Sequence, residues 1–294
     1  MADLEVVEFT DPGCSWAWGT EPKLRLLGWR FGDRLKWRRV LGGLIGDMNN
    51  YVENFDPVRG AKSQSRYWRD VFTYTGMTYP VRLEWMYTST EPPGKAVKAA
   101  ELQSDDAGAR VLRRLRESIF VFGRPADTNE RILDAVRGVE GLDHDRFAAD
   151  LGTEAVEKSF HEDWVETRRP NDYVMTLEGD RPGIGRAKNT EGHWRYVFPT
   201  IIFRGPGGEA TVPGWCAYEE YEQAMETVAP GSTDGPKPDP TPDDVFATWP
   251  TASAKEIEVL CGEQSAIPDG VVTYDWGEGS FFLTGAEAAS RGVS

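Results

Sequence analysis

Short apolar runs near the start and towards the end of the chain flank a long region of amphipathic segments. Residues 4–9 and 35–41 are apolar enough to form strands, and the turn residues at 10–13 close the first one. Between them, residues 14–31 carry large apolar side chains at helical spacing, which predicts a helix that contains Pro22. The pattern therefore predicts a strand, a helix and a second strand in this order.

The middle of the chain, from about residue 50 to residue 171, has the pattern of successive helices. Its clearest amphipathic helix spans residues 109–122, with four apolar residues on one face, namely Leu112, Leu115, Ile119 and Phe122. Further helices are predicted at 96–103, 143–151 and 154–168, and one that begins after Asp127 or Thr128 as its N-cap. Strands return at 196–203 and 210–212, and a helix follows at 218–228.

The composition changes after residue 228. Residues 229–244 are rich in Pro, Gly, Ser and Asp and are predicted to form a linker. Residues 245–294 then contain two predicted short helices and a predicted hairpin, an order that resembles a small winged-helix-like module. This module has only Lys255 and Arg291 as basic residues, so docking or a homodimer contact is expected of it rather than DNA binding.

Composition and charge narrow the class of protein. The 294 residues include 39% hydrophobic and 12% aromatic residues, which indicates a folded protein. No apolar run is long enough for a membrane helix, no signal peptide is expected, and three Cys cannot form a disulfide scaffold, so a cytoplasmic location is expected. The net charge of −15 repels phosphate backbones and anionic lipids. Neither nucleic acid nor a membrane is therefore expected as a partner.

The order of predicted elements, together with two short motifs, resembles the thioredoxin fold with a helical insertion. The first motif follows the first strand and reads Asp-Pro-Gly-Cys-Ser-Trp-Ala-Trp at residues 11–18; the second is Phe-Pro-Thr at residues 198–200. This combination resembles the DsbA-type thioredoxin-like family, which also holds FrnE-like proteins and chromene-carboxylate isomerases. The resemblance implies an α/β thioredoxin-like domain over residues 1–228, in which residues from about 45 to 185 form the helical insertion.

The resemblance also implies a site around Cys14. It makes Pro199 a cis-proline beside the reactive sulfur, and it makes Phe198, Pro199 and Thr200 a substrate-binding loop. Trp16 is expected to line the same groove, and Asp11, Pro12, Ser15 and Ala17 are the other positions of the motif. Metal, nucleotide and flavin are not expected.

Cys14 has a local environment that favours thiol chemistry. A cysteine at a helix start lies near unpaired backbone N–H groups and the positive end of the helix dipole, so its pKa is expected below the usual value of about 8.5. The alternative is a buried, inert residue. The redox members of the family carry a second cysteine three residues later, where this chain has Ala17. Dithiol chemistry through such a pair is therefore excluded.

Three functions remain open for a site with one thiol. Cys14 could act as a monothiol in a thiol-disulfide oxidoreductase of the DsbA/FrnE type, with a protein or small thiol as its substrate. The domain could instead be a non-catalytic binding or adaptor protein that keeps the groove, or a glutathione-type isomerase that positions a low-molecular-weight thiol. Cys216, in a loop that the fold brings near the cis-proline, is a possible resolving thiol, although a lone buried cysteine is the more common outcome.

Overall fold

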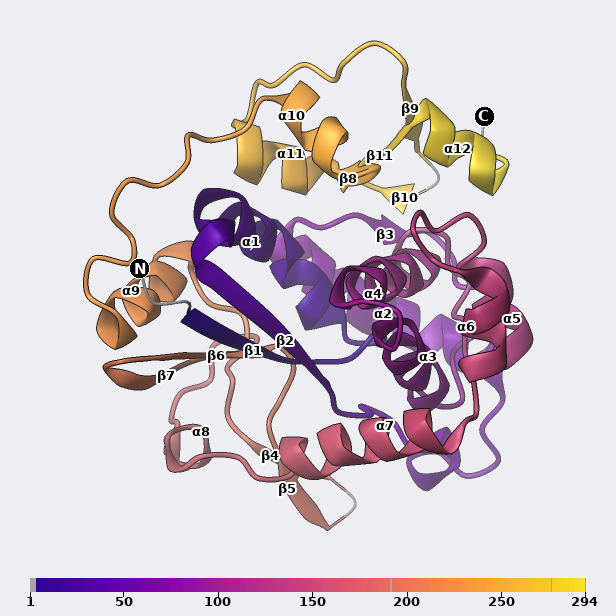
Figure 1. Ribbon diagram of the computed structural model, residues 1–294. Helices are drawn as coiled ribbons and strands as arrows, with labels where there is room; N and C mark the ends of the chain where they lie inside the picture. The colour runs from indigo at the N-terminus through magenta and orange to yellow at the C-terminus, as the bar shows by residue number, and fades with distance from the viewer. Residues whose placement is uncertain (1–3, 191, 276, 294) are drawn as a thin grey trace.

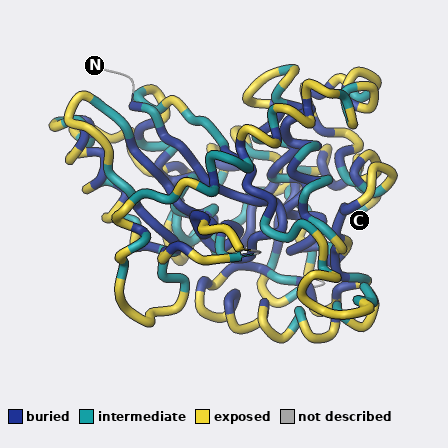
Figure 2. The backbone as a smooth tube through the Cα atoms, turned by 90° about the horizontal axis from the view of Figure 1, so that it is seen from below, coloured by how far each residue is buried: buried dark blue, intermediate teal, exposed yellow. Residues whose placement is uncertain are grey.

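The computed structural model describes residues 4–190, 192–275 and 277–293, so the first three residues of the predicted 1–228 domain lie outside the described residues. Its centre is a four-stranded sheet with the order β2-β1-β6-β7, in which β1 pairs in parallel with β2 and antiparallel with β6. Its strands are β1 (Leu4–Thr10), β2 (Leu35–Leu41), β6 (Thr200–Gly205) and β7 (Gly208–Pro213). Most residues of β1 and β6 are buried. Figure 2 shows that buried backbone runs through the middle of the molecule and that exposed segments lie at its edge.

Two helices belong to this sheet. Helix α1 (Ser15–Phe31) connects β1 to β2, and α9 (Tyr218–Val228) follows β7, as Figure 1 shows. The predicted strand at 35–41 and the predicted helix at 218–228 are confirmed in full. The prediction for 196–203 is wrong in its first half, because β6 begins only at Thr200. The Phe198–Pro199 peptide bond before it is cis, as the family resemblance implied.

The helical insertion lies between β2 and β6 and covers one end of the sheet (Figure 1). Thr128 caps α5 and Asp143 caps α6, each by accepting a backbone N–H, which confirms the predicted N-cap at Thr128. On α4, Leu112, Leu115 and Ile119 are buried as the amphipathic pattern predicts. The helices are α2 (Pro57–Thr75), α3 (Glu91–Glu101), α4 (Asp105–Phe120), α5 (Asn129–Ala135), α6 (His144–Asp150), α7 (Glu154–Thr167) and α8 (Asp172–Thr176). The short strands β3 (Tyr79–Pro80), β4 (Lys188–Thr190) and β5 (His193–Arg195) also lie here.

The C-terminal residues form a three-stranded antiparallel sheet with the order β8-β11-β9, flanked by short helices. The two predicted helices and the predicted hairpin are present, while β8 and the last helix were not predicted. The elements are α10 (Pro242–Thr248), β8 (Thr251–Ser253), α11 (Ala254–Cys261), β9 (Val271–Tyr274), β10 (Gly277–Glu278), β11 (Phe281–Thr284) and α12 (Gly285–Arg291). The predicted domain boundaries stay a prediction. Helix α10 begins at Pro242, inside the predicted linker at 229–244.

The C-terminal elements pack directly on the rest of the chain. Phe281 and Leu283 of β11 are buried in one hydrophobic cluster with Trp18 of α1 and Phe120 of α4. The segment before α10 lies along α1, where Arg30 pairs with Asp239 and the indole N–H of Trp29 donates to the carbonyl of Pro238. The docking expected of this module is thus made to its own chain.

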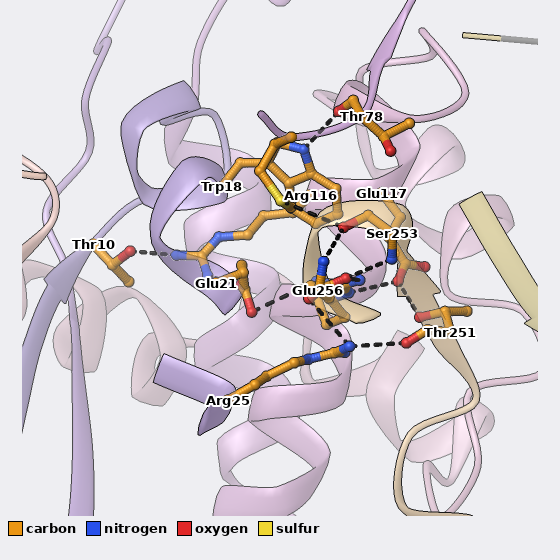
Figure 3. Close-up of polar contacts among 12 residues, drawn as sticks. Thr10, Trp18, Glu21, Arg25, Thr78, Arg116, Glu117, Thr251, Ser253 and Glu256 are labelled. Atoms are coloured by element: carbon orange, nitrogen blue, oxygen red, sulfur yellow. Dashed lines mark hydrogen bonds and ion pairs between the residues drawn. The ribbon is translucent and has the colours of Figure 1, made fainter. Parts of the chain in front are cut away.

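A network of buried charged side chains connects α1, α4 and the C-terminal elements (Figure 3). The guanidinium of Arg113 on α4 binds both carboxylate oxygens of Glu256 on α11, at 2.8 and 2.9 Å. Arg25 on α1 pairs with the same carboxylate at 3.1 Å. Arg291 on α12 binds Glu117 on α4, whose carboxylate is fully buried. Burial alone would raise the pKa of Glu117, but Arg291 and Arg113 outweigh it and hold that pKa well below its usual range.

Candidate functional site

Cys14 is the N-cap residue of α1, at the junction between β1 and the helix. Its side chain is only 5% exposed, and it packs in a cluster with Phe9, Val40 and Phe198. Val174 of α8 and Ala187, which precedes β4, belong to the same cluster. Cys14 is therefore buried, as in the alternative that the sequence left open, in a cluster that includes residues from the far end of the helical insertion.

The electrostatic environment of Cys14 is the reverse of the one expected. Burial raises the pKa of the Cys14 thiol to about 11, and the negative charge of Asp11 also raises it. The backbone N–H groups of Ala17 and Trp16 and the charge of Arg116 lower the pKa only in part. The predicted thiolate pKa below about 8.5 is thus wrong, because loss of solvation outweighs the favourable helix N-terminus.

The thiol is engaged by the cis-proline loop. Cys14 Sγ donates a hydrogen bond to the carbonyl oxygen of Phe198 at 3.2 Å. The carbonyl of Pro199 accepts the N–H of Gly214 at 2.7 Å, and the hydroxyl of Thr200 donates to the carbonyl of Val197. The structure thus brings Phe198, Pro199 and Thr200 to Cys14 as predicted. All three are buried, and the carbonyls of Phe198 and Pro199 accept hydrogen bonds from within the chain.

Asp11 organises the turn before the cysteine. One carboxylate oxygen accepts the N–H of Gly13, and the other accepts the N–H of Leu44 and the hydroxyl of Thr90. Burial raises the pKa of Asp11 to about 6 in spite of these bonds. The motif positions Pro12, Ser15 and Ala17 are buried as well. The shape of the turn is therefore built from internal contacts.

An aromatic surface lies beside this turn. The indole N–H of Trp16 donates to the hydroxyl of Tyr67 at 3.2 Å, and its ring meets Tyr74 edge-on. Tyr74 in turn meets Trp215, with 5.1 Å between the ring centroids. Tyr67 and Tyr74 are half-exposed on α2, and Trp16 is partly buried. Trp16 was predicted; the other three were not, although two tyrosines seven residues apart on one helix face are a readable signal.

Cys216 is buried in a different cluster from Cys14, with Tyr221 and Met225 of α9. Its sulfur donates to the carbonyl of Pro213 and accepts a hydrogen bond from Arg181. Burial raises the pKa of this thiol, and Arg181 lowers it in part. Cys14 and Cys216 are both free thiols. The resolving role of Cys216 stays a prediction.

The site therefore consists of a protonated, buried thiol bound to the cis-proline loop, with an aromatic surface at its edge. The thioredoxin family model matches residues 8–169, which include β1, the cysteine turn and most of the helical insertion. The chain belongs to the thioredoxin family. Among the described residues, no helix is long and apolar enough to cross a membrane, and no group of three or more His, Cys, Asp or Glu side chains could hold a metal ion.

Relatives of this DsbA-like chain carry the name of an adapter. The ClpXP adapter protein SpxH of Halalkalibacterium halodurans is 32% identical over 201 residues, which are 66% of this chain and 64% of the relative. SpxH of Bacillus subtilis is 26% identical over 247 residues, or 81% of this chain and 71% of the relative. The chain spans less than two thirds of the length of the H. halodurans and Shouchella clausii relatives.

Two solved structures share the fold. A Nitrosomonas europaea protein proposed to be a disulfide isomerase has a TM-score of 0.57 at 15% identity and covers 76% of this chain and 97% of its own. The cytosolic disulfide reductase DsbM of Pseudomonas aeruginosa has a TM-score of 0.50 at 19% identity, covering 78% of this chain and 94% of its own. At such identities the likeness shows the DsbA-like thioredoxin fold alone.

Proposed function

We propose that this chain is a non-catalytic thioredoxin-fold adapter that binds a partner protein and delivers it to a protease of the ClpXP type. The observation that carries the proposal is the state of Cys14. Burial raises the pKa of the Cys14 thiol to about 11, so the thiol is protonated at neutral pH. Ala17 supplies no second thiol, and the thiol proton is bound to Phe198. The names of the relatives support the same function.

The aromatic surface gives the adapter a place for a partner. Trp, Tyr and Phe dominate the energetics of protein interfaces because they bury a large area at a small cost in side-chain entropy. Tyr67 is 51% exposed and Tyr74 45% exposed, and both contact Trp16. A groove that bound substrates in catalytic relatives would thus hold a protein segment without reacting with it. A cytoplasmic location is part of the proposal, and the expected homodimer stays a prediction.

The decisive experiment compares the wild-type protein with Cys14→Ser. Both proteins are tagged, and their partners are co-purified with and without dithiothreitol and identified. An adapter retains the same partner in all four samples, because the complex is non-covalent. The partner is then purified, and its degradation by reconstituted ClpXP is followed. Faster degradation in the presence of either protein supports the proposal, and no acceleration overturns it.

A monothiol oxidoreductase is the second candidate, because the contact between Cys14 and the cis-proline loop is the geometry that holds a substrate disulfide in the family. It predicts partners that are lost on addition of dithiothreitol and absent from Cys14→Ser. It also predicts that the protein catalyses the reduction of insulin by glutathione. In that case glutathione would be the low-molecular-weight thiol that the sequence left open. The same co-purification therefore separates the two functions.

A further inference from the structure

A cleft of about 1230 Å³ lies away from Cys14, between the helical insertion and the C-terminal elements. Its walls come from α4 and α5 on one side, from β9 and α12 on the other, and from the segment that follows β3. These elements gather near the C-terminus in Figure 1. The pairing of β10 with β3, between Gly277 and Pro80 and between Glu278 and Tyr79, fixes the third wall against the C-terminal part.

Six arginines line this cleft, namely Arg82, Arg114, Arg124, Arg131, Arg137 and Arg291. Five of them already form ion pairs: Arg124 with Glu84, Arg131 with Asp127, Arg137 with Asp134, and both Arg114 and Arg291 with Glu287. The donors left for an anionic ligand are therefore those of Arg82 and of the exposed side chains of Arg124 and Arg137.

Several of these arginines keep donors for a ligand. Arg82 is exposed and makes no ion pair with any residue in the described part of the chain. Arg124 is 66% exposed and binds Glu84 through Nε, which leaves its terminal nitrogens facing solvent. Arg137 is 76% exposed beside Asp134. A planar guanidinium binds a carboxylate through two parallel hydrogen bonds, so each of these side chains suits a Glu or Asp of a ligand.

Aromatic side chains lie among the arginines. The guanidinium of Arg131 stacks on Trp85, 4.1 Å from the ring centroid, and Phe122 contacts Tyr274 with 4.9 Å between the rings. All three aromatic residues are partly exposed in the cleft. A ligand that fits this lining carries apolar side chains as well as carboxylates. An unfolded or extended protein segment combines both, whereas an inorganic anion has only charge.

We propose that this cleft binds an extended acidic segment of the partner protein, with aromatic or aliphatic residues between its carboxylates. The proposal rests on the proposed adapter function and adds the chemistry of the partner. The cleft exceeds the range of about 300–1,000 Å³ typical of small-molecule sites. A polyanion such as RNA would also meet the repulsion of the acidic body, whereas a short acidic segment responds to the charges within about 8 Å of it.

The test uses a short dye-labelled peptide that alternates Glu with Tyr, and a second peptide with Gln in place of Glu. Fluorescence anisotropy with the full chain is expected to give a Kd about tenfold lower for the acidic peptide, and the difference is expected to shrink as salt is added. Equal binding of the two peptides would overturn the proposal.

Charge reversal locates the binding. Arg82→Glu/Arg124→Glu is expected to weaken the acidic peptide by about tenfold or more, since both side chains are exposed and their loss leaves the core intact. The matched control is Arg146→Glu/Lys158→Glu, which makes the same change in net charge at exposed positions elsewhere. An equal loss of affinity for the acidic peptide in both double variants would show a non-specific charge effect. It would overturn the assignment of binding to this cleft. Arg82→Ala alone is a milder variant, expected to lose about threefold.

Two further outcomes separate this inference from its alternatives. A labelled single-stranded oligonucleotide that binds more tightly than the acidic peptide, and loses binding in Arg82→Glu/Arg124→Glu, would overturn the peptide assignment. The protein could fail to accelerate degradation of the partner by ClpXP while Arg82→Glu/Arg124→Glu still weakens binding of the acidic peptide. The adapter function would then fail, and the cleft proposal would stand. If the partner is delivered normally by Arg82→Glu/Arg124→Glu, the adapter function stands and the cleft proposal fails.

Discussion

The Cys14 thiol and the Phe198 carbonyl, 184 residues apart in sequence, are joined by a hydrogen bond of 3.2 Å. The bond connects the start of α1 to the residue before the cis-proline. Because the thiol is the donor, the bond exists only while the sulfur is protonated, and loss of the proton would leave a carbonyl oxygen facing a thiolate. The contact therefore stabilises the protonated thiol of Cys14 relative to its thiolate.

The first prediction concerns alkylation of Cys14. Because the pKa is raised to about 11, the rate with iodoacetamide is expected to rise steadily with pH from 7 to 10 without a plateau. Mass spectrometry of the tryptic peptide identifies Cys14 separately from Cys216 and Cys261. The same protein in denaturant is the control, in which the rate is expected to level off above about pH 8.5. A plateau below that pH in the native protein would contradict the buried, protonated thiol.

The second prediction concerns Ala17, which stands where the redox members of the family have their second cysteine. Ala17→Cys restores a two-cysteine motif in the first turn of α1, yet Cys14 stays buried and its hydrogen bond to Phe198 is unchanged. Insulin reduction by Ala17→Cys is therefore expected to stay at the uncatalysed rate. Cys14→Ser/Ala17→Cys is the control for reactions of the new thiol alone. Reductase activity that needs both cysteines would show that only Ala17 separates this chain from an oxidoreductase.

The sequence predicted those features that depend on neighbouring residues. The strands at 4–9 and 35–41 are local apolar runs, and the cysteine turn and the Phe-Pro-Thr segment are contiguous motifs. The burial of Cys14 was not predictable in this way, because other members of its buried cluster, Val174 and Ala187, lie far along the chain. The basic cleft was missed for the same reason: separate segments around Arg82, Arg137 and Arg291 contribute its charges. The start of β6 was missed because apolar residues before Pro199 resemble a strand.

The third prediction concerns pH. Burial raises the pKa of Asp11 to about 6 from 3.8, so the folded state holds a proton that the unfolded state has released between these values. The contribution of Asp11 to stability is therefore present below about pH 4 and is lost as the pH rises to about 6, by roughly 3 kcal/mol. The advantage of the wild type over Asp11→Asn in urea unfolding is expected to shrink over this range. Asp163, raised to about 6 as well, titrates in both proteins and cancels. A difference independent of pH would contradict the assignment.

The fourth prediction tests the charges that hold the C-terminal elements. Glu256 is fully buried and binds Arg113 and Arg25. Glu256→Gln removes the ion-pair partner of the buried Arg25, while Arg113 keeps Glu117 and Glu21. The cost is expected to be about 3–5 kcal/mol in the free energy of unfolding, measured by urea titration. Glu258→Gln on the same helix is the matched control. Glu258 is 41% exposed and pairs only at the surface with Lys255, so a change below about 1 kcal/mol is expected. Equal effects would show that the buried pair adds nothing specific.

The last prediction connects backbone geometry to the cleft. Gly123 has a φ of +69°, and a Cβ there would lie 2.2 Å from the carbonyl oxygen of Arg82. Its own carbonyl accepts the N–H of Glu84, so this glycine holds the wall that presents Arg82. Gly141 also has a positive φ, +75°, but open space around it. Gly141→Ala is therefore expected to cost only the backbone strain of about 1–2 kcal/mol. Gly123→Ala is expected to lower the free energy of unfolding by more than this, because the segment at Arg82 must also move. It is also expected to weaken binding of the acidic peptide, whereas Gly141→Ala is expected to leave that binding unchanged. Equal thermal midpoints and equal peptide affinities for the two variants would show that the wall at Arg82 tolerates the displacement and does not set the binding geometry.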